Sequence, residues 1–246
     1  MKAILVIREF DVFSRILAEN NYEIINLPLI ETKISKDLSD FETKLAQIEN
    51  YDGIFLTSSN AARIFAAKLR EKNISFGGKV YVLGKRGSEI LKTEHLNLVY
   101  DESANTARAM LENIASEDLR EKRFLFVRGA TSLRIVPEFL ANIGEVDETI
   151  VYETLNIKIE AARMQNLRER FERKEIAGAC FFSPSAAESF IEQFGANILH
   201  QTIIAAIGKT TAEYVEQRNL KVVLVSSKAT AEDFAVELIE YLKEEI

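Results

Sequence analysis

The apolar positions of this chain follow two alternating patterns. Short, almost wholly apolar runs predict strands covered on both faces, as in a parallel sheet, whereas longer segments with apolar residues every three to four positions predict amphipathic helices. We predict strands at 2–7, 22–29, 53–56, 79–83, 96–100, 123–127, 145–151, 177–182, 203–207 and 221–225, and helices at 10–19, 37–49, 60–72, 87–93, 104–115, 132–142, 161–173, 185–194, 210–218 and 230–244. This alternation predicts an α/β fold of parallel sheets wrapped by helices, with ligands beyond the carboxyl ends of the strands.

One strand-to-helix corner occurs twice in the chain. Residues 52–65, DGIFLTSSNAARIF, and residues 177–190, AGACFFSPSAAESF, share a glycine, a serine, two alanines and a phenylalanine about 125 positions apart. Downstream, VLGK at 82–85 matches AIGK at 206–209, and upstream ILVIR at 4–8 resembles FLFVR at 124–128. A repeat of about 122 residues therefore fills the chain and predicts two related lobes, and the extended segments 29–36 and 151–161 fall at equivalent points of the two copies.

Composition narrows the range of partners. The chain has 246 residues, 47% of them apolar, and a net charge of −7 without a basic run, which argues against nucleic-acid and anionic-membrane partners. The opening apolar run is too short for a signal peptide, and no 18-residue apolar stretch follows, so we expect a cytoplasmic protein. One cysteine, Cys180, and two distant histidines, His95 and His200, leave no internal disulfide and no multi-thiolate metal site, and we expect no cofactor.

Several common catalytic motifs are absent. Lys209-Thr210 after Gly208 resembles the end of a phosphate-binding P-loop, but that motif needs a glycine where the chain has Ile203. Neither the dinucleotide motif G-x-G-x-x-G nor the hydrolase motif G-x-S-x-G occurs. Cys180 lies within an apolar strand and is expected to be a core residue.

Four strand-to-helix corners share hydroxyl groups or glycines. Helix capping explains them, since Ser185 with Glu188, and Thr210 with Glu213, have the spacing of a capping box. Helix amino termini also bind anions through free N–H groups, so four of them at strand carboxyl ends could hold a polyanionic ligand. The candidate residues are Ser58, Ser59, Asn60, Gly84, Lys85, Ser183, Ser185, Gly208, Lys209, Thr210 and Thr211.

Two arginines and a tyrosine complete the candidates. Arg8 and Arg128 each follow the first strand of their copy, where they either meet the ligand or form a surface ion pair with a carboxylate. Tyr152 lies in the second extended segment and has either a packing or a chemical role.

The order of these motifs is similar to that of the uroporphyrinogen-III synthase family. The matching segments are FLTS ending at Ser58, VYET around Tyr152, FFSPSA at 181–186, AIGKTTA at 206–212 and ATAEDF at 229–234. The resemblance implies two flavodoxin-like lobes, one of residues 1–33 with 155–246 and one of 36–150, joined by a two-stranded connector of 29–36 and 151–161.

The resemblance also implies a reaction. Enzymes of this family are cofactor-independent lyases that close hydroxymethylbilane, a linear tetrapyrrole with eight carboxylates, to uroporphyrinogen III with loss of water and inversion of the last ring. Tyr152 would donate a hydrogen bond or proton to the departing hydroxyl, while the candidates above, with Arg8 and Arg128, would hold carboxylates. A monomer is implied, with transient hand-over of the bilane from hydroxymethylbilane synthase. The alternative is a two-lobed binding module or sensor that closes on a small anion without turnover.

Two positions depart from the family pattern. Gly87 stands where relatives often have a threonine, so a hydroxyl contact from the Gly84 corner is not expected. After Arg128-Gly129 the family commonly has a second glycine, whereas this chain continues with ATSL to Arg134.

Overall fold

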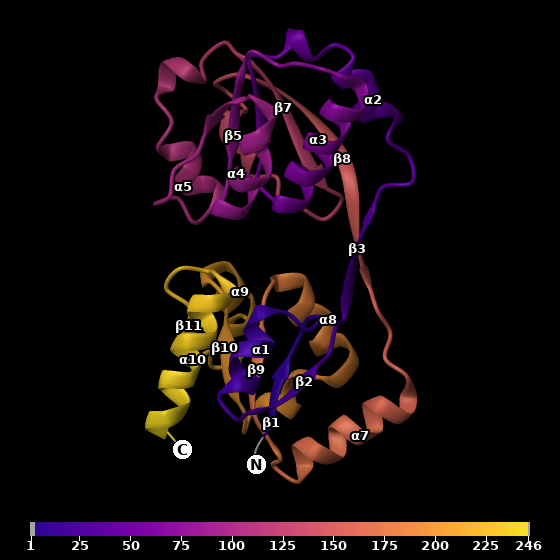
Figure 1. Cartoon of the computed structure of the whole chain (residues 1–246), viewed down its shortest axis with the longest axis vertical. Helices are drawn as coiled ribbons and strands as arrows, with labels where there is room; N and C mark the ends of the chain where they lie inside the picture. Colours follow the sequence, from indigo (N-terminus) through magenta and orange to yellow (C-terminus); the bar gives the residue numbers. More distant parts are fainter. Residues whose placement is uncertain (1–2, 246) are drawn as a thin grey trace. The chain divides into compact units, whose positions relative to one another are not determined.

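The computed structural model describes residues 3–245 and divides into two compact units (Figure 1). One unit joins the residues up to Glu31 to those from Leu155 onward, and we call it the discontinuous lobe. The other is the single stretch Thr32–Thr154, which we call the continuous lobe.

The discontinuous lobe is built on a five-stranded sheet in the order β11-β10-β9-β1-β2. All of its neighbouring strands run parallel. Counted along the chain within this lobe, the order is 5-4-3-1-2, which is the flavodoxin-like arrangement with its switch point between β1 and β9. The strands are β1 (Ala3–Val6), β2 (Glu23–Asn26), β9 (Ile176–Phe181), β10 (Ile203–Ala206) and β11 (Leu224–Val225).

The continuous lobe repeats this arrangement in a six-stranded sheet of order β3-β8-β7-β4-β5-β6. Here β7 and β8 take the places that β1 and β2 have in the other lobe, and the pairs from β8 to β6 are parallel. The strands are β3 (Ile30–Ile34), β4 (Gly53–Leu56), β5 (Lys79–Val82), β6 (Asn97–Val99), β7 (Arg123–Gly129) and β8 (Glu145–Asn156). Each lobe therefore combines the first strands of one repeat copy with the last strands of the other, and the predicted α/β fold with two parallel-sheet lobes is confirmed.

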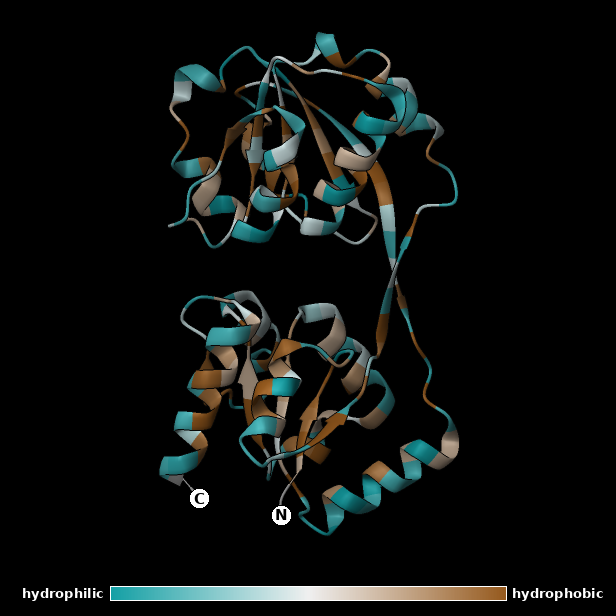
Figure 2. Cartoon of the chain, in the orientation of Figure 1, coloured by the Kyte–Doolittle hydropathy of each residue, from teal (hydrophilic) through white to brown (hydrophobic). Residues whose placement is uncertain are grey.

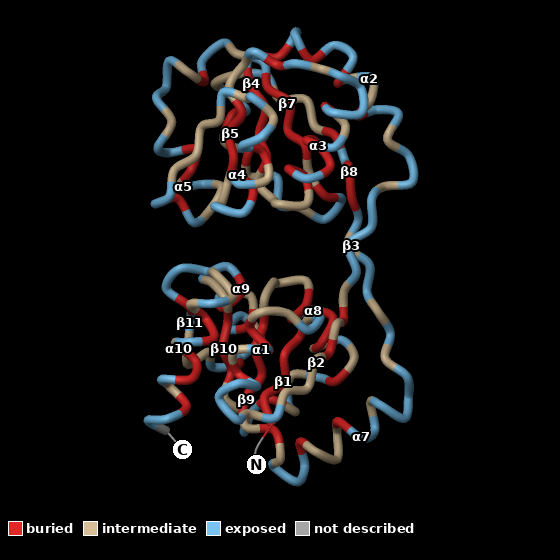
Figure 3. The backbone as a smooth tube through the Cα atoms, viewed as in Figure 1, coloured by how far each residue is buried: buried red, intermediate tan, exposed pale blue. Residues whose placement is uncertain are grey.

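Helices cover both faces of each sheet, and the apolar strands lie between them (Figures 2 and 3). In the continuous lobe, one core cluster centres on Phe65 and Leu125, and the other on Phe55 and Phe126. The α-helices are α1 (Val12–Glu19), α2 (Ser39–Leu45), α3 (Ser59–Lys72), α4 (Lys85–Leu91), α5 (Ala107–Glu112), α6 (Ile135–Leu140), α7 (Ala161–Glu172), α8 (Pro184–Phe194), α9 (Lys209–Glu216) and α10 (Ala231–Glu245). Short 3-10 helices occupy Ile48–Asn50, Lys92–Glu94, Ser116–Asp118 and Ala196–Leu199. Within the described residues, no helix is both long and apolar enough to cross a membrane.

The structure differs from the predicted elements mainly at edges and helix ends. The apolar pattern did not predict strand β3, because Glu31, Thr32 and Lys33 are exposed and polar; β3 lies within the extended segment 29–36 that the repeat and the family resemblance had indicated. The predicted strand 221–225 shortens to β11, an edge strand that pairs with β10 through two residues. The predicted helix 37–49 ends at Leu45 and continues as a 3-10 turn, and 104–115 shortens to α5.

Candidate active site

Ser58 begins helix α3 directly beyond the carboxyl end of β4. Its backbone is extended (φ −141°, ψ 147°), and its Oγ accepts a hydrogen bond from the Ala61 amide at 3.1 Å, as expected of an N-cap. Tyr152, from β8, donates its hydroxyl to the same Oγ at 3.1 Å. Since a serine oxygen has two acceptor sites and one donor, Ser58 keeps its own O–H for a ligand.

Gly129, at the end of β7, makes room for this tyrosine. Gly129 pairs in register with Tyr152, and a Cβ on Gly129 would lie 2.5 Å from the tyrosine ring. The ring is only 9% exposed, so its hydroxyl has a fixed position at the switch point between β7 and β4. Sequence reasoning did not select Gly129, although a glycine directly after Arg128 at a strand end was an available signal.

The Gly84 corner gives the continuous lobe a second helix amino terminus. Gly84 has φ +83°, a value that favours glycine, and its N-cap position has no side-chain hydrogen bond. Lys85 is exposed, and Ser59 and Asn60 of the Ser58 corner are partly exposed. A Cβ on Gly87 would lie 2.8 Å from Val82 Cγ1, so this glycine allows α4 to approach β5 closely and explains why no hydroxyl residue stands there.

Ser183 is the counterpart of Ser58 in the discontinuous lobe. It caps α8 with the same geometry, since its Oγ accepts from the Ala186 amide at 3.1 Å and its φ and ψ are −162° and 156°. Ser185 lies inside the first turn, with its Oγ 3.2 Å from that of Ser183. The capping-box interpretation of Ser185 was wrong, because the N-cap is Ser183, two residues earlier, and Pro184 takes the first helical position.

The Gly208 corner carries the remaining candidates of this lobe. Gly208 is the N-cap of α9 in an extended conformation without a side-chain bond, so the predicted capping by Thr210 was also wrong. Lys209 and Thr210 are exposed, whereas Thr211 is 4% exposed and faces the lobe interior. The corner thus offers exposed side chains and free helix amides together.

Arg8 lies at the carboxyl end of β1 and contacts its own lobe. Its guanidinium pairs with Asp11 at 3.0 Å and lies over the Phe182 ring, 4.3 Å from the centroid. Asp11 also caps α1 by accepting from the Phe13 amide. The surface ion pair predicted as one alternative is therefore present.

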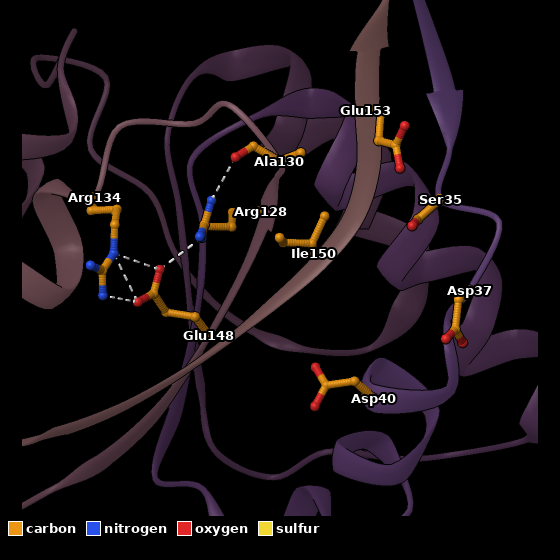
Figure 4. A pocket seen from close by; sticks show the side chains of 9 residues that line it. All are labelled: Ser35, Asp37, Asp40, Arg128, Ala130, Arg134, Glu148, Ile150 and Glu153. Carbon is orange, nitrogen blue, oxygen red and sulfur yellow. Dashed lines mark hydrogen bonds and ion pairs between the residues drawn. The ribbon is translucent and has the colours of Figure 1, made fainter.

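Arg128 is more enclosed than Arg8. Its Nε lies 2.7 Å from Glu148, and its Nη1 donates to the carbonyl oxygens of Gly129 and Ala130 at 2.9 and 3.2 Å. Arg134 binds the same carboxylate (Figure 4). The hydrogen bond from Arg134, helped by the charge of Arg128, holds the pKa of Glu148 below its usual value.

These three charged side chains line a cavity of the continuous lobe (Figure 4). Two arginines share Glu148, so these three side chains together carry one net positive charge. The acidic residues Asp37, Asp40 and Glu153 line the same cavity. The lining consists of Ser35, Asp37, Asp40, Arg128, Ala130, Arg134, Glu148, Ile150 and Glu153. Sequence reasoning had not paired Glu148 with the arginines, because nothing in their spacing indicates the contact.

The remaining reactive residues are one buried cysteine and two exposed histidines. Cys180 is fully buried, which raises the pKa of its thiol, and its predicted core position is confirmed. His95 and His200 are exposed. Among the described residues, no group of three or more His, Cys, Asp or Glu side chains could hold a metal ion.

Comparisons with known proteins agree with one another. The family model described as uroporphyrinogen-III synthase HemD matches residues 11–235. A uroporphyrinogen-III synthase from Chlorobaculum parvum is 28% identical over 99% of this chain and all of its own length. The Helicobacter pylori uroporphyrinogen-III synthetase structure covers 98% of this chain and 100% of its own, with 19% identity and a TM-score of 0.65. A mutant Thermus thermophilus synthase covers 98% and 99%, with 14% identity and a TM-score of 0.69. The chain belongs to the uroporphyrinogen-III synthase family, a family of hydro-lyases in tetrapyrrole biosynthesis.

Proposed function

We propose that this chain closes hydroxymethylbilane to uroporphyrinogen III, with loss of water and inversion of the last ring, and that Tyr152 assists departure of the hydroxyl. Membership of the family supports the reaction. The observation that supports the site is the hydrogen bond of 3.1 Å between Tyr152 and the cap of α3. This bond joins the phenol to the N-cap of α3 beside the switch point of the continuous lobe, and ligands of α/β folds bind near such points.

Tyr152 is suited to a donor role by its position. A departing hydroxide is a poor leaving group, and a proton from the phenol turns it into water. The hydrogen now directed at Ser58 can rotate toward the substrate without movement of the ring, since a phenol hydrogen is not fixed by the heavy atoms.

The helix ends would hold the carboxylates of the bilane. Free amides and the positive end of a helix favour an anion without a formal positive charge, which is compatible with a net charge of −7. Immobilising the substrate in a single conformation can supply on the order of 7–11 kcal/mol of the barrier reduction. We assign this holding role to Arg8, Ser58, Ser59, Asn60, Gly84, Lys85, Arg128, Ser183, Ser185, Gly208, Lys209 and Thr210, but not to the predicted Thr211, whose side chain is buried.

Arg8 and Arg128 would take part through exchange of partners. Both guanidiniums already contact a carboxylate: Arg8 lies 3.0 Å from Asp11, and Arg128 lies 2.7 Å from Glu148. A substrate carboxylate would have to share or replace these contacts. The larger solvent exposure of Arg8, 30% against 13% for Arg128, makes it the more accessible of the two.

An isomer assay tests the reaction itself. Purified protein given fresh hydroxymethylbilane should yield mainly the type III isomer, separated by chromatography after oxidation. Closure to type I at the uncatalysed rate would contradict the proposal, and compaction on ligand binding without turnover would indicate the alternative, a binding module or sensor.

Tyr152→Phe tests the role of the phenol. We expect turnover to fall by about a hundredfold, with KM roughly kept, because the loss affects proton donation more than binding. Tyr51→Phe is the matched control, since Tyr51 is 7% exposed and donates one hydrogen bond, to Asp147 at 2.9 Å, but precedes β4 at the opposite edge of the same sheet. Equal turnover in both variants would leave catalysis to positioning alone.

We also propose that the enzyme acts as a cytoplasmic monomer and receives its substrate by transient hand-over from hydroxymethylbilane synthase. The chemistry of the substrate supports hand-over, because free hydroxymethylbilane closes to the symmetric type I isomer without the enzyme.

A further inference from the structure

Two of the most exposed large apolar side chains in the described part of the chain occupy corresponding loops of the two lobes. Phe10 is 62% exposed in the loop between β1 and α1, and Leu133 is 66% exposed in the loop between β7 and α6. Each stands directly before the N-cap of its helix, which is Asp11 in α1 and Arg134 in α6. The repeat relates β1 to β7, so Phe10 and Leu133 share a position in the fold as well as a high solvent exposure.

An ordinary structural explanation for this position is missing in both loops. An apolar residue before the N-cap commonly packs on the fourth helical residue and fixes the entry of the chain. That residue is Arg15 in α1 and Glu138 in α6, and neither is apolar. Phe182, before the N-cap of α8, shows the contrast, since its ring packs against Phe13 and Phe234 at centroid distances of 4.9 and 5.3 Å.

The position of these loops points to a ligand. Both follow the strand that flanks the switch point of its sheet, β1 beside β9 and β7 beside β4. Ligands of such folds bind outside these strand ends. Single exposed apolar residues need no explanation, but a pair at equivalent ligand-facing loops does. Within residues 3–245, the other exposed large apolar side chains are Ile34, Ile150, Leu155, Val225 and Val236, none of which lies in a loop that follows β1 or β7.

We propose that Phe10 and Leu133 contact the pyrrole rings of the bilane, each for its own lobe. This inference rests on the proposed function. The substrate carries its carboxylates at the ring edges, where helix amides can hold them, and this leaves flat apolar ring faces that amides do not satisfy. A phenylalanine ring and a leucine side chain provide the complementary surface. Such contacts bind ground state and transition state alike, so they contribute to affinity and not to the chemical step.

Kinetics of Phe10→Ala and Leu133→Ala provide the first test. We expect KM to rise on the order of tenfold in each variant, with kcat within about twofold of the unchanged chain. Phe10→Leu, which keeps an apolar side chain, should recover much of the loss. Val236→Ala on α10 is the control, because Val236 is 48% exposed and lies on a helix surface outside the strand-end loops. The melting temperature should be unchanged in all of them, since the altered side chains are exposed.

A single tryptophan gives a second readout that is independent of turnover. The chain contains no tryptophan, so Phe10→Trp and Val236→Trp each introduce one fluorophore. Titration with uroporphyrinogen III under anaerobic conditions should shift the emission of the residue-10 probe to the blue and leave the residue-236 probe unchanged.

The outcomes separate this inference from the proposed function. An unchanged KM in both alanine variants, or no blue shift at residue 10, would overturn it, as would a fall in kcat with KM kept. The unchanged chain, run in the same assay, shows independently whether type III product forms.

Discussion

The corners at Ser58 and Ser183 share a backbone but differ in their neighbours. Both serines cap a helix beyond the strand next to the switch point, with cap bonds of 3.1 Å. Ser58 additionally receives the hydroxyl of Tyr152, whose repeat counterpart is Ile30, since Glu31-Thr32 corresponds to Glu153-Thr154. Ser183 instead has the hydroxyl of Ser185 within 3.2 Å.

This difference shows how a duplicated fold can divide one task. The two lobes have similar serine caps, and a tyrosine in β8 adds a phenol to only one of them. The proposed mechanism therefore assigns proton donation to the continuous lobe alone, and the two corners can be perturbed in matched pairs.

The largest effect is expected from Gly129→Ala, because it would displace Tyr152 from Ser58 and so remove the contact that distinguishes the Ser58 corner from the Ser183 corner. A Cβ at 2.5 Å from the Tyr152 ring must displace it, and the repeat counterpart of Gly129 is Glu9, where no such ring needs room. We expect turnover to fall by about a hundredfold, as for Tyr152→Phe, and the free energy of unfolding to fall by about 1–3 kcal/mol. Gly77→Ala is the control in steady-state kinetics and denaturant unfolding, since its Cβ would meet open space. Full activity in Gly129→Ala would show that the ring position does not matter.

A smaller effect should distinguish Ser58→Ala from Ser183→Ala. Each loses an N-cap, which costs about 1 kcal/mol in the free energy of unfolding. Only Ser58→Ala also removes the partner of the Tyr152 hydroxyl, so its kcat should fall by about tenfold more than that of Ser183→Ala. Equal kcat values from the same preparations would indicate that the two corners act alike.

The smallest effect concerns the two equivalent arginines, Arg8 and Arg128. Glu148→Gln should lower the free energy of unfolding at neutral pH by about 1 kcal/mol, because it leaves a largely enclosed arginine without its charge partner. The folded state lowers the pKa of Glu148, so its stabilisation is present above the ordinary glutamate value of about 4.3 and is lost as the pH falls through the lower, folded-state value.

Denaturant titrations between pH 7 and pH 3 measure this loss. The stability gap between the unchanged chain and Glu148→Gln should narrow as the pH falls. Asp11→Asn, which keeps an oxygen to cap α1 and affects the more exposed Arg8, should cost less at pH 7. A gap that is constant with pH would contradict the assigned charge effect.

Much of the fold was accessible from local pattern. Continuous apolar runs such as residues 53–56 become buried central strands, and the bounds of β4 match the prediction fully. The repeat and the family resemblance, which the family model confirms, supplied the rest of the architecture.

What the sequence could not supply depends on contacts between distant residues. The bond between Tyr152 and Ser58 joins strand β8 to the helix cap that follows β4, and its geometry depends on the register of β7 with β8. The choice of Ser183 over Ser185 as a cap was readable in principle, since a proline favours the first helical position, and Pro184 was the neglected signal. The sharing of Glu148 by Arg128 and Arg134 has no local signature.

The exchange of strands between the repeat copies also fixes an order of events during synthesis. Strand β1 is made first, yet it is a fully buried interior strand of a sheet that needs β9, where Ala3 pairs with Ile176. Until β9 is made, the apolar side chains of β1 have no complete sheet to pack into. During this time the growing chain is exposed to aggregation. The continuous lobe can form in the meantime, and the pairing of β3 with β8 then brings the two ends of this lobe side by side. A loop of more than a hundred residues is thereby already closed when β9 arrives, which lowers the entropy cost of completing the second sheet.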